Sequence, residues 1–238
     1  MLASQLAVPQ CGFVFSSLRS ASIGMARCTA LLLLLVALAI PALTQEDAED
    51  PRVLLRLYYE SLCPDSVRFV RNQLKPTWEA LGPKFLRVDF VPFGKAKSER
   101  RPGGGLDFTC QHGPRECYGN KVQACGLSYL LADHDKRVEF VNCAMSSHDP
   151  PAAGELCAQK VGLDYSYIEE CLNSPAADAL LYNYEQRTLK LYPEGIPFVP
   201  TITINNKFDQ DAQAAGQRDL KSVICAYIPE SVRPQQCL

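Results

Sequence analysis

Beyond its N-terminal region, the chain opens on a pattern of strand, helix and strand. Residues 53–59 are almost continuously apolar, β-branched or aromatic, which is typical of a strand buried on both faces. Apolar side chains then recur at the spacing of one helical face over residues 67–78, and Pro64 occupies the first helical position. A Gly-Pro pair at 82–83 ends this helix, and residues 85–91 alternate between apolar and polar side chains as in a second strand. These elements predict a βαβ unit with a right-handed crossover.

The C-terminal part of the chain predicts a ββα unit. Strand character returns at residues 198–204. Asn205 and Asn206 then provide a two-residue turn that tolerates positive φ, after which residues 207–208 begin a short strand in the opposite direction. An amphipathic helix fits residues 212–227.

The segment between these two halves has the pattern of a helical insertion. Residues 95–105 are basic and glycine-rich; since no Gly-Lys-Ser/Thr follows and no strand leads into them, a solvated, flexible loop is favoured over a phosphate-binding loop. Residues 106–190 show helical patterns, broken at 149–151 and 173–175, and contain six cysteines. We therefore expect residues 52–238 to form one α/β domain with a thioredoxin-like fold. A disulfide-stapled helical insertion, at about residues 95–190, would separate its βαβ half from its ββα half.

An export signal precedes this domain. Residues 31–40 are an unbroken apolar run, preceded by Arg27 and followed by small residues, which is typical of a signal peptide. The run is shorter than the roughly 20 residues that cross a bilayer, so an uncleaved anchor is the less favoured alternative. We expect residues 1–45 to be removed, with Met25 as a candidate alternative start, and the mature protein to follow the secretory pathway without contacting a membrane.

Composition and charge narrow the classes of partner. The 238 residues are 47% hydrophobic and 21% charged, which excludes a disordered chain and provides for a substantial core. Because Arg19 and Arg27 leave with the leader, 22 basic and 26 acidic side chains remain and the mature net charge is −4. Such a chain lacks the basic footprint of a nucleic-acid-binding protein, so nucleic acid is not an expected partner. The oligomeric state stays open.

The number of cysteines indicates one free thiol. The sequence has 11, and nine remain once Cys11 and Cys28 are removed. In an oxidising compartment eight of the nine can pair, in any of about 105 arrangements, and one is left over. Export favours disulfides over zinc, and the cysteines of residues 110–125 lack the close pairs of a zinc site, so no metal is expected. The eight assigned to structural disulfides of open pairing are Cys110, Cys117, Cys125, Cys143, Cys157, Cys171, Cys225 and Cys237.

Cys63 is the candidate for the free, nucleophilic thiol. It lies where the first predicted strand meets the first predicted helix, and the unpaired N–H groups and the dipole of a helix N-terminus stabilise a thiolate. Asp65 would oppose this effect if its carboxylate faced the sulfur. The alternative is that Cys63 belongs to a structural disulfide.

Pro200 opens the strand that follows the insertion. In thioredoxin-like folds a proline at this place is typically cis and its loop packs beside the nucleophilic cysteine, whereas an ordinary proline at a strand start is trans. We favour the cis form here, with the backbone of Val199 available to pair with an extended substrate as an added strand.

Residues 110–125 carry the most specific motif in the chain. They read CQHGPRECYGNKVQAC, which resembles the signature CQHGxxECxxNxxExC of the gamma-interferon-inducible lysosomal thiol reductase (GILT) family, with Gln123 where the pattern has Glu. The similarity extends over roughly residues 52–238. It implies a thioredoxin-like fold, passage through the secretory pathway and reduction of disulfides in protein substrates, often in acidic endocytic compartments, with an immune role. Within the signature we interpret His112 as a structural hydrogen-bonding residue rather than a proton shuttle.

The chain departs from the family pattern at the redox motif. Where the family has Cys-x-x-Cys, this sequence has Cys63-Pro64-Asp65-Ser66, and a serine hydroxyl does not resolve a mixed disulfide. We therefore expect monothiol exchange without a bound cofactor, in which glutathione or free cysteine acts as the external reductant. The alternative is a secreted, catalytically lapsed protein that binds or captures substrates. The chain has no Asn-x-Ser/Thr sequon for glycan-dependent sorting, so secretion and delivery to the endosomal or lysosomal lumen both stay open.

Overall fold

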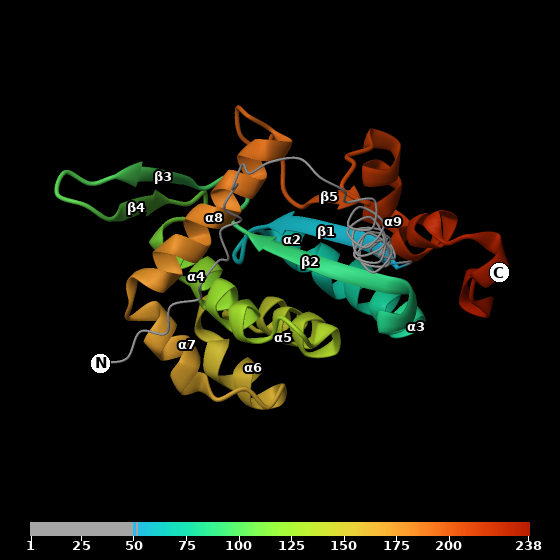
Figure 1. The fold of residues 1–238 in the computed structure, drawn as a ribbon, viewed down its shortest axis with the longest axis horizontal. Helices are drawn as coiled ribbons and strands as arrows, with labels where there is room; N and C mark the ends of the chain where they lie inside the picture. The colour runs from blue at the N-terminus through green and yellow to red at the C-terminus, as the bar shows by residue number, and fades with distance from the viewer. Residues whose placement is uncertain (1–49, 51) are drawn as a thin grey trace, which may run out of the picture. The chain divides into compact units, whose positions relative to one another are not determined.

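The computed structural model describes residues 50 and 52–238, and the predicted signal peptide lies outside the described residues. A three-stranded sheet is at the centre of the described part, with strand order β2-β1-β5 (Figure 1). Its strands are β1 (Val53–Tyr59), β2 (Leu86–Pro92) and β5 (Thr201–Ile204). β1 pairs with β2 in parallel and with β5 antiparallel. The predicted βαβ unit is therefore confirmed, and β1 is buried at six of its seven positions because it is the central strand.

The crossover helix runs from Pro64 as one helical segment with a π-helical stretch in its middle. It comprises α2 (Pro64–Phe69), η2 (Val70–Leu74) and α3 (Lys75–Phe85), and the residues at both junctions keep right-handed helical backbone angles. Gly82 interrupts it with a positive φ of 63°, so the Gly-Pro pair ends the regular helix as predicted, and only one further turn separates it from β2.

Residues 95–105, expected to be a flexible loop, instead contribute to a β-hairpin. β3 (Lys97–Arg100) pairs antiparallel with β4 (Leu106–Thr109), and three consecutive glycines with positive φ, residues 103–105, lie in the connection. The prediction was wrong because β3 is short and has no apolar side chain, and β4 has only two, Leu106 and Phe108. The hairpin is anchored by a residue distant in the sequence. Glu185 accepts hydrogen bonds from Ser98 N, at 2.9 Å, and from Ser98 Oγ.

Five α-helices and one 3₁₀ turn form the insertion, and they separate at the two predicted breaks. Asp133, Asp164 and Ser174 accept hydrogen bonds from the first turns of α5, α7 and α8, as N-cap side chains do. Figure 1 shows these helices gathered on the β2 side of the sheet, whereas the last helix lies beside β5. The insertion consists of α4 (Pro114–Tyr129), α5 (His134–Ser146), η3 (Pro150–Ala152), α6 (Gly154–Lys160), α7 (Tyr165–Leu172) and α8 (Pro175–Leu191).

Four disulfides fasten this arrangement. Cys125–Cys171 joins α4 to α7, and Cys143–Cys157 joins α5 to α6. Cys110–Cys117 closes a loop of seven residues at the start of α4, and Cys225–Cys237 ties the last helix to the C-terminal tail. The insertion is therefore stapled by disulfides, as expected.

The C-terminal unit differs from the expected ββα pattern in one respect. Asn205 and Asn206 take positive φ, as the turn requires, but the returning strand amounts to a single bridge between Ile204 and Lys207. The reason is that the side chain of Asp209 already caps α9 (Gln210–Tyr227), by accepting a hydrogen bond from Ala212 N, and this leaves no length for a strand. Among the described residues, no helix is both long and apolar enough to cross a membrane.

The packing of α4 against α5 in the insertion can be tested at a position where the two helices lie very close together. A Cβ on Gly126 of α4 would lie 2.4 Å from the ring of Phe140 on α5, which is fully buried. Gly126→Ala should therefore lower the free energy of unfolding by about 1–3 kcal/mol, despite the better helix propensity of alanine.

Urea denaturation of the purified domain measures this effect. The double variant Gly126→Ala/Phe140→Leu removes much of the obstructing ring edge and should recover part of the loss relative to Phe140→Leu alone. A Gly126→Ala variant as stable as the parent would contradict the close contact between α4 and α5.

Candidate active site

Cys63 occupies the junction between the sheet and the first helix. Four residues, 60–63, connect β1 to α2, and Cys63 is the N-cap residue, with extended backbone angles of φ −65° and ψ 119°. Its carbonyl accepts the helical hydrogen bond from Val67 N at 3.0 Å. Among the described cysteines it alone is free, and 6% of its surface is exposed. The predicted position of Cys63 at the N-terminus of the first helix is therefore confirmed.

The sulfur faces the loop that precedes β5. Cys63 Sγ lies 3.9 Å from the carbonyl oxygen of Val199, and the Val199–Pro200 peptide bond is cis. Together with the segments around Lys95 and His112, these residues enclose a cleft of about 290 Å³. Three parts of the chain that are far apart in sequence thus meet around the thiol.

The other residues of the redox motif have partners of their own, and Pro64 and Asp65 line the cleft beside Cys63. Asp65 is largely exposed and forms an ion pair with Arg68, at 2.5 Å, so its charge is partly compensated. Ser66 is fully buried, and its hydroxyl accepts a hydrogen bond from the backbone N–H of Glu60 at 3.4 Å. The position that would resolve a mixed disulfide in the family pattern is therefore occupied by a side chain that supports the backbone of the 60–63 loop.

Helix α4 holds that loop in place through buried polar side chains. Asn120 Oδ1 accepts a hydrogen bond from Ser61 N at 2.8 Å, and Ser61 Oγ donates to the backbone carbonyl of Glu116 at 3.0 Å. One turn further along α4, Gln123 Oε1 accepts from the hydroxyl of Tyr59 at 2.6 Å. Because Gln123 keeps an acceptor oxygen, the substitution for Glu in the signature preserves this bond. The signature motif is thus a support for the backbone that presents Cys63.

A second group of side chains from the signature reaches the cleft itself. The loop closed by Cys110–Cys117 carries Gln111 and His112 into the cleft wall. Glu116 fixes His112 with both oxygens, which accept from the backbone N–H at 2.9 Å and from ring Nδ1 at 2.6 Å. The same Nδ1 lies 3.5 Å from Oε2 of Glu60, a fully buried oxygen with no hydrogen-bond partner. The structural role inferred for His112 therefore depends on two carboxylates that the sequence did not single out.

The pKa of Glu60 is raised to about 7: burial is the main cause and the neighbouring Glu116 carboxylate adds to it, while the Lys95 backbone N–H and His112 act in the opposite direction. The carboxyl group fits only because residue 94 is glycine, since a Cβ there would lie 2.3 Å from Glu60 Cγ. At acidic pH this buried group is therefore neutral.

Glu60, His112 and Glu116 also form the one group in the described part of the chain whose ligand atoms lie close enough to hold a metal ion, within 4.8 Å of one another. Both oxygens of Glu116 are already used by His112, so a cation would have to displace these bonds. The closeness of the two residues in the signature could have suggested the His112–Glu116 pair, since His112 lies in the turn just before α4 and Glu116 in the first turn of that helix. Nothing local in the sequence indicated Glu60 as their neighbour.

The fold and the placement of Cys63 define a thioredoxin-like thiol–disulfide oxidoreductase. The crystal structure of oxidised BdbD from Bacillus subtilis is similar in fold, with a TM-score of 0.53 at 14% identity, and the match covers 76% of this chain and 89% of that one. The family model described as gamma interferon inducible lysosomal thiol reductase (GILT) matches residues 54–161.

Similarity to individual proteins extends over most of the chain. This protein is 34% identical over 199 residues to GILT-like protein 1 of Drosophila melanogaster, a match that covers 78% of each chain. It is 31% identical over 192 residues to the gamma-interferon-inducible lysosomal thiol reductase of Mus musculus, which covers 79% of this chain and 73% of that one. The protein belongs to the GILT family.

Removal of the Asn120 side chain tests the support of the loop. Asn120→Ala leaves the buried N–H of Ser61 without its acceptor, which should lower the free energy of unfolding by about 1–3 kcal/mol. The exposed Asn72 provides a matched control, since Asn72→Ala should change stability by less than about 0.5 kcal/mol. Chemical denaturation compares the two variants, and equal effects would contradict the support role.

The raised pKa of Glu60 predicts a stability that depends on pH. The unfolded carboxyl titrates near 4.5 and the folded one near 7, so the contribution is complete below the unfolded pKa and is lost as pH rises through about 7. Between pH 4.5 and pH 8 the parent should lose on the order of 3 kcal/mol more than Glu60→Gln does.

Denaturation curves at several pH values measure this difference. Glu155→Gln, at an exposed position, should follow the parent. If Glu60→Gln shows the same pH slope as the parent, the buried carboxyl does not titrate in this range.

Proposed function

We propose that this protein reduces disulfides in protein substrates by monothiol exchange at Cys63, with glutathione or free cysteine as the external reductant and without a bound cofactor. The observation that carries the proposal is the free cysteine at the N-terminus of α2, bordering a cleft and facing the loop before β5. The functional domain is residues 52–238, including the insertion, because α4 supports the loop that presents the thiol.

The reaction consists of thiol–disulfide exchanges. The Cys63 thiolate attacks one sulfur of the substrate disulfide, a mixed disulfide forms, and the other substrate sulfur leaves as a thiolate that takes up a proton. One external thiolate then attacks Cys63 Sγ and releases the second substrate thiol. A second external thiol frees Cys63 and leaves as an oxidised dimer with the first. Each substrate disulfide therefore consumes two external thiols, and one of them must resolve the mixed disulfide because Ser66 supplies no thiol.

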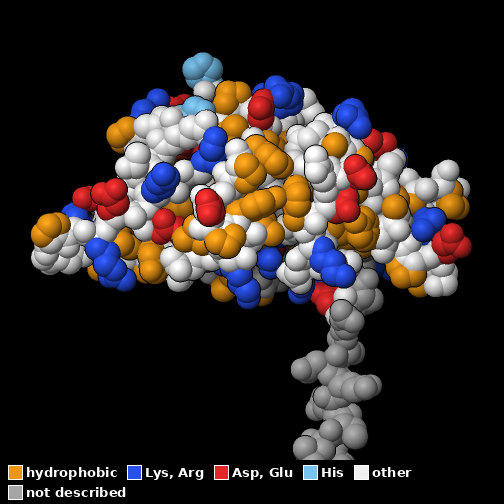
Figure 2. Space-filling view, turned by 90° about the horizontal axis from the view of Figure 1, so that it is seen from above, with side chains coloured by type: hydrophobic (Ala, Val, Ile, Leu, Met, Phe, Trp, Pro, Cys, Tyr) orange, Lys and Arg blue, Asp and Glu red, His pale blue; other side chains and the backbone are white. Residues whose placement is uncertain are grey.

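The loop before β5 is suited to bind an extended polypeptide. Among the described residues, neither the N–H nor the carbonyl of Val199 takes part in a backbone–backbone hydrogen bond, and the carbonyl contacts only Cys63 Sγ, at 3.9 Å; a substrate strand that reaches the thiol can pair with them. Phe198, at 41% exposure, adds an apolar contact beside it. Figure 2 views the molecule from above Figure 1 and shows hydrophobic side chains gathered near the middle of this face, with charged side chains around them. We infer that the partners are unfolded or locally opened proteins that contain disulfides.

An acidic lumen suits the buried carboxyl beside the cleft. Because the pKa of Glu60 is raised to about 7 by burial, the folded state is favoured where the pH lies below that value. This supports an endosomal or lysosomal site of action over the neutral extracellular space. Secretion stays the alternative, since nothing in the described residues addresses sorting.

Reduction of a denatured disulfide-containing protein, at pH 5 and pH 7, tests the mechanism. With excess glutathione or cysteine, the parent should turn over and Cys63→Ser should fall to the uncatalysed rate. Without external thiol, the parent should stop at one mixed disulfide per molecule, detectable by mass spectrometry. Ser66→Cys should then release substrate unaided, because it restores a resolving thiol.

Ser231→Cys is the matched control, since it adds a thiol at an exposed position outside the cleft and should not release substrate. The second candidate function, a lapsed catalyst that captures substrates, is favoured by the serine at position 66. It predicts no turnover in the parent with any thiol, and turnover in Ser66→Cys. Persistence of activity in Cys63→Ser would exclude both functions.

A further inference from the structure

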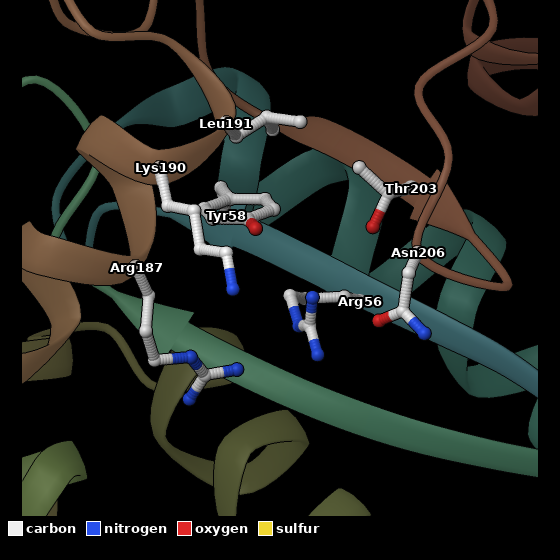
Figure 3. Close-up of a pocket in the computed structure, with 7 residues that line it drawn as sticks. All are labelled: Arg56, Tyr58, Arg187, Lys190, Leu191, Thr203 and Asn206. Atoms are coloured by element: carbon white, nitrogen blue, oxygen red, sulfur yellow. The ribbon is translucent and has the colours of Figure 1, made fainter.

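A second pocket, of about 420 Å³, lies on the sheet away from the thiol cleft (Figure 3). It is bounded by β1, α8, β5 and the turn that follows β5. None of its lining residues also lines the cleft around Cys63. The pocket and the redox site are therefore separate features of the described part of the chain.

The pocket collects positive charge. Arg56 of β1, together with Arg187 and Lys190 of α8, lines it, and Figure 3 shows the ends of these three side chains directed toward the space between β1 and α8. One carboxylate offsets them: Asp89 Oδ2 accepts from Arg56 Nε at 2.7 Å and also pairs with Arg187. Both guanidinium groups keep further N–H donors, since each uses only one nitrogen for this carboxylate.

Lys190 leaves the local charge unbalanced. Among the described residues its ammonium group has neither an ion-pair nor a hydrogen-bond partner. Three cations and one carboxylate give a net charge of two positive units around the pocket, in a chain whose overall charge is −2. The concentration of cations is therefore a local property and not a reflection of a basic protein.

A buried hydroxyl in the pocket also lacks a partner. Thr203 is 2% exposed, and its Oγ1 makes no hydrogen bond in the described structure. In Figure 3 this oxygen points into the pocket, and the side chain of Asn206 lies beside it. A buried hydroxyl without a partner is costly, and a ligand oxygen would satisfy it.

We propose that this pocket binds a doubly charged oxyanion: inorganic sulfate, inorganic phosphate or the phosphate monoester group of a small molecule. Its net charge matches that of the pocket, and guanidinium groups present paired N–H donors to such oxygens. The hydroxyl of Thr203 and the ammonium group of Lys190 complete a set of donors from two strands and a helix.

Titration of thermal stability with sodium sulfate and sodium phosphate, against sodium chloride at equal ionic strength, tests the proposal. Binding to the folded state should raise the melting temperature in a saturable way. Sulfate and phosphate also stabilise proteins non-specifically, without saturation, and this part should be the same in every variant.

Lys190→Gln and Thr203→Val should each weaken the saturable part by about tenfold or more, since each removes one donor to a charged ligand. Thr203→Val keeps the branched shape of the side chain, so its fold should persist. Lys221→Gln, at an exposed position of α9 outside the pocket, removes the same charge and should bind like the parent.

Calorimetric titration with inorganic sulfate and with a sugar phosphate distinguishes the sources. Tighter binding of either supports the proposal and identifies whether the anion is free or esterified. The proposal is overturned if the parent and Lys190→Gln respond equally to both anions, or if only an acidic peptide binds.

Discussion

The structure depends on the hydrogen bonds between α4 and the short loop that joins β1 to α2. These bonds unite the two halves of the molecule, because the loop belongs to the sheet and α4 belongs to the insertion. Each bond is buried, and two of the three use side chains of α4, Asn120 and Gln123; a buried donor or acceptor without its partner costs about 1–3 kcal/mol. The helix and the loop are therefore stable only in contact with each other. The thiol occupies its position because the signature helix is folded beneath it.

The chemistry of the site depends on the groups around the sulfur of Cys63 and on the absence of a second thiol at position 66. Cys63 is the N-cap residue of α2, its sulfur faces the loop before β5, and a histidine held by carboxylates forms part of the wall. The hydroxyl of Ser66 is engaged with the backbone of the same loop. The substitution of serine at this position thus removes one function, resolution of the mixed disulfide, while it leaves the support of the loop in place.

Much of the architecture could be predicted because it depends on burial or on local turn chemistry. The apolar run of β1 indicated a central strand, and Asn205-Asn206 indicated a turn with positive φ. The odd number of cysteines indicated a free thiol. The four pairings could not be predicted, since the order of the cysteines does not reveal which helices pack together. The hairpin of β3 and β4 was missed because its strands are only four residues long, β3 has no apolar side chain, and the anchor Glu185 lies 87 residues away from Ser98. Glu60 was missed because its environment is built by residues distant from it in the sequence: Gly94, Lys95 and the start of α4.

The loop closed by Cys110–Cys117 has a consequence for the shape of the site. This disulfide holds the segment that brings Gln111 and His112 to the cleft, so the wall of the site is itself made of the bond type that the protein acts on. Its two half-cystines are each 7% exposed, whereas Cys125 and Cys157 in the insertion core are not exposed at all. The shape of the site therefore depends on one disulfide that stays oxidised while the neighbouring Cys63 is free.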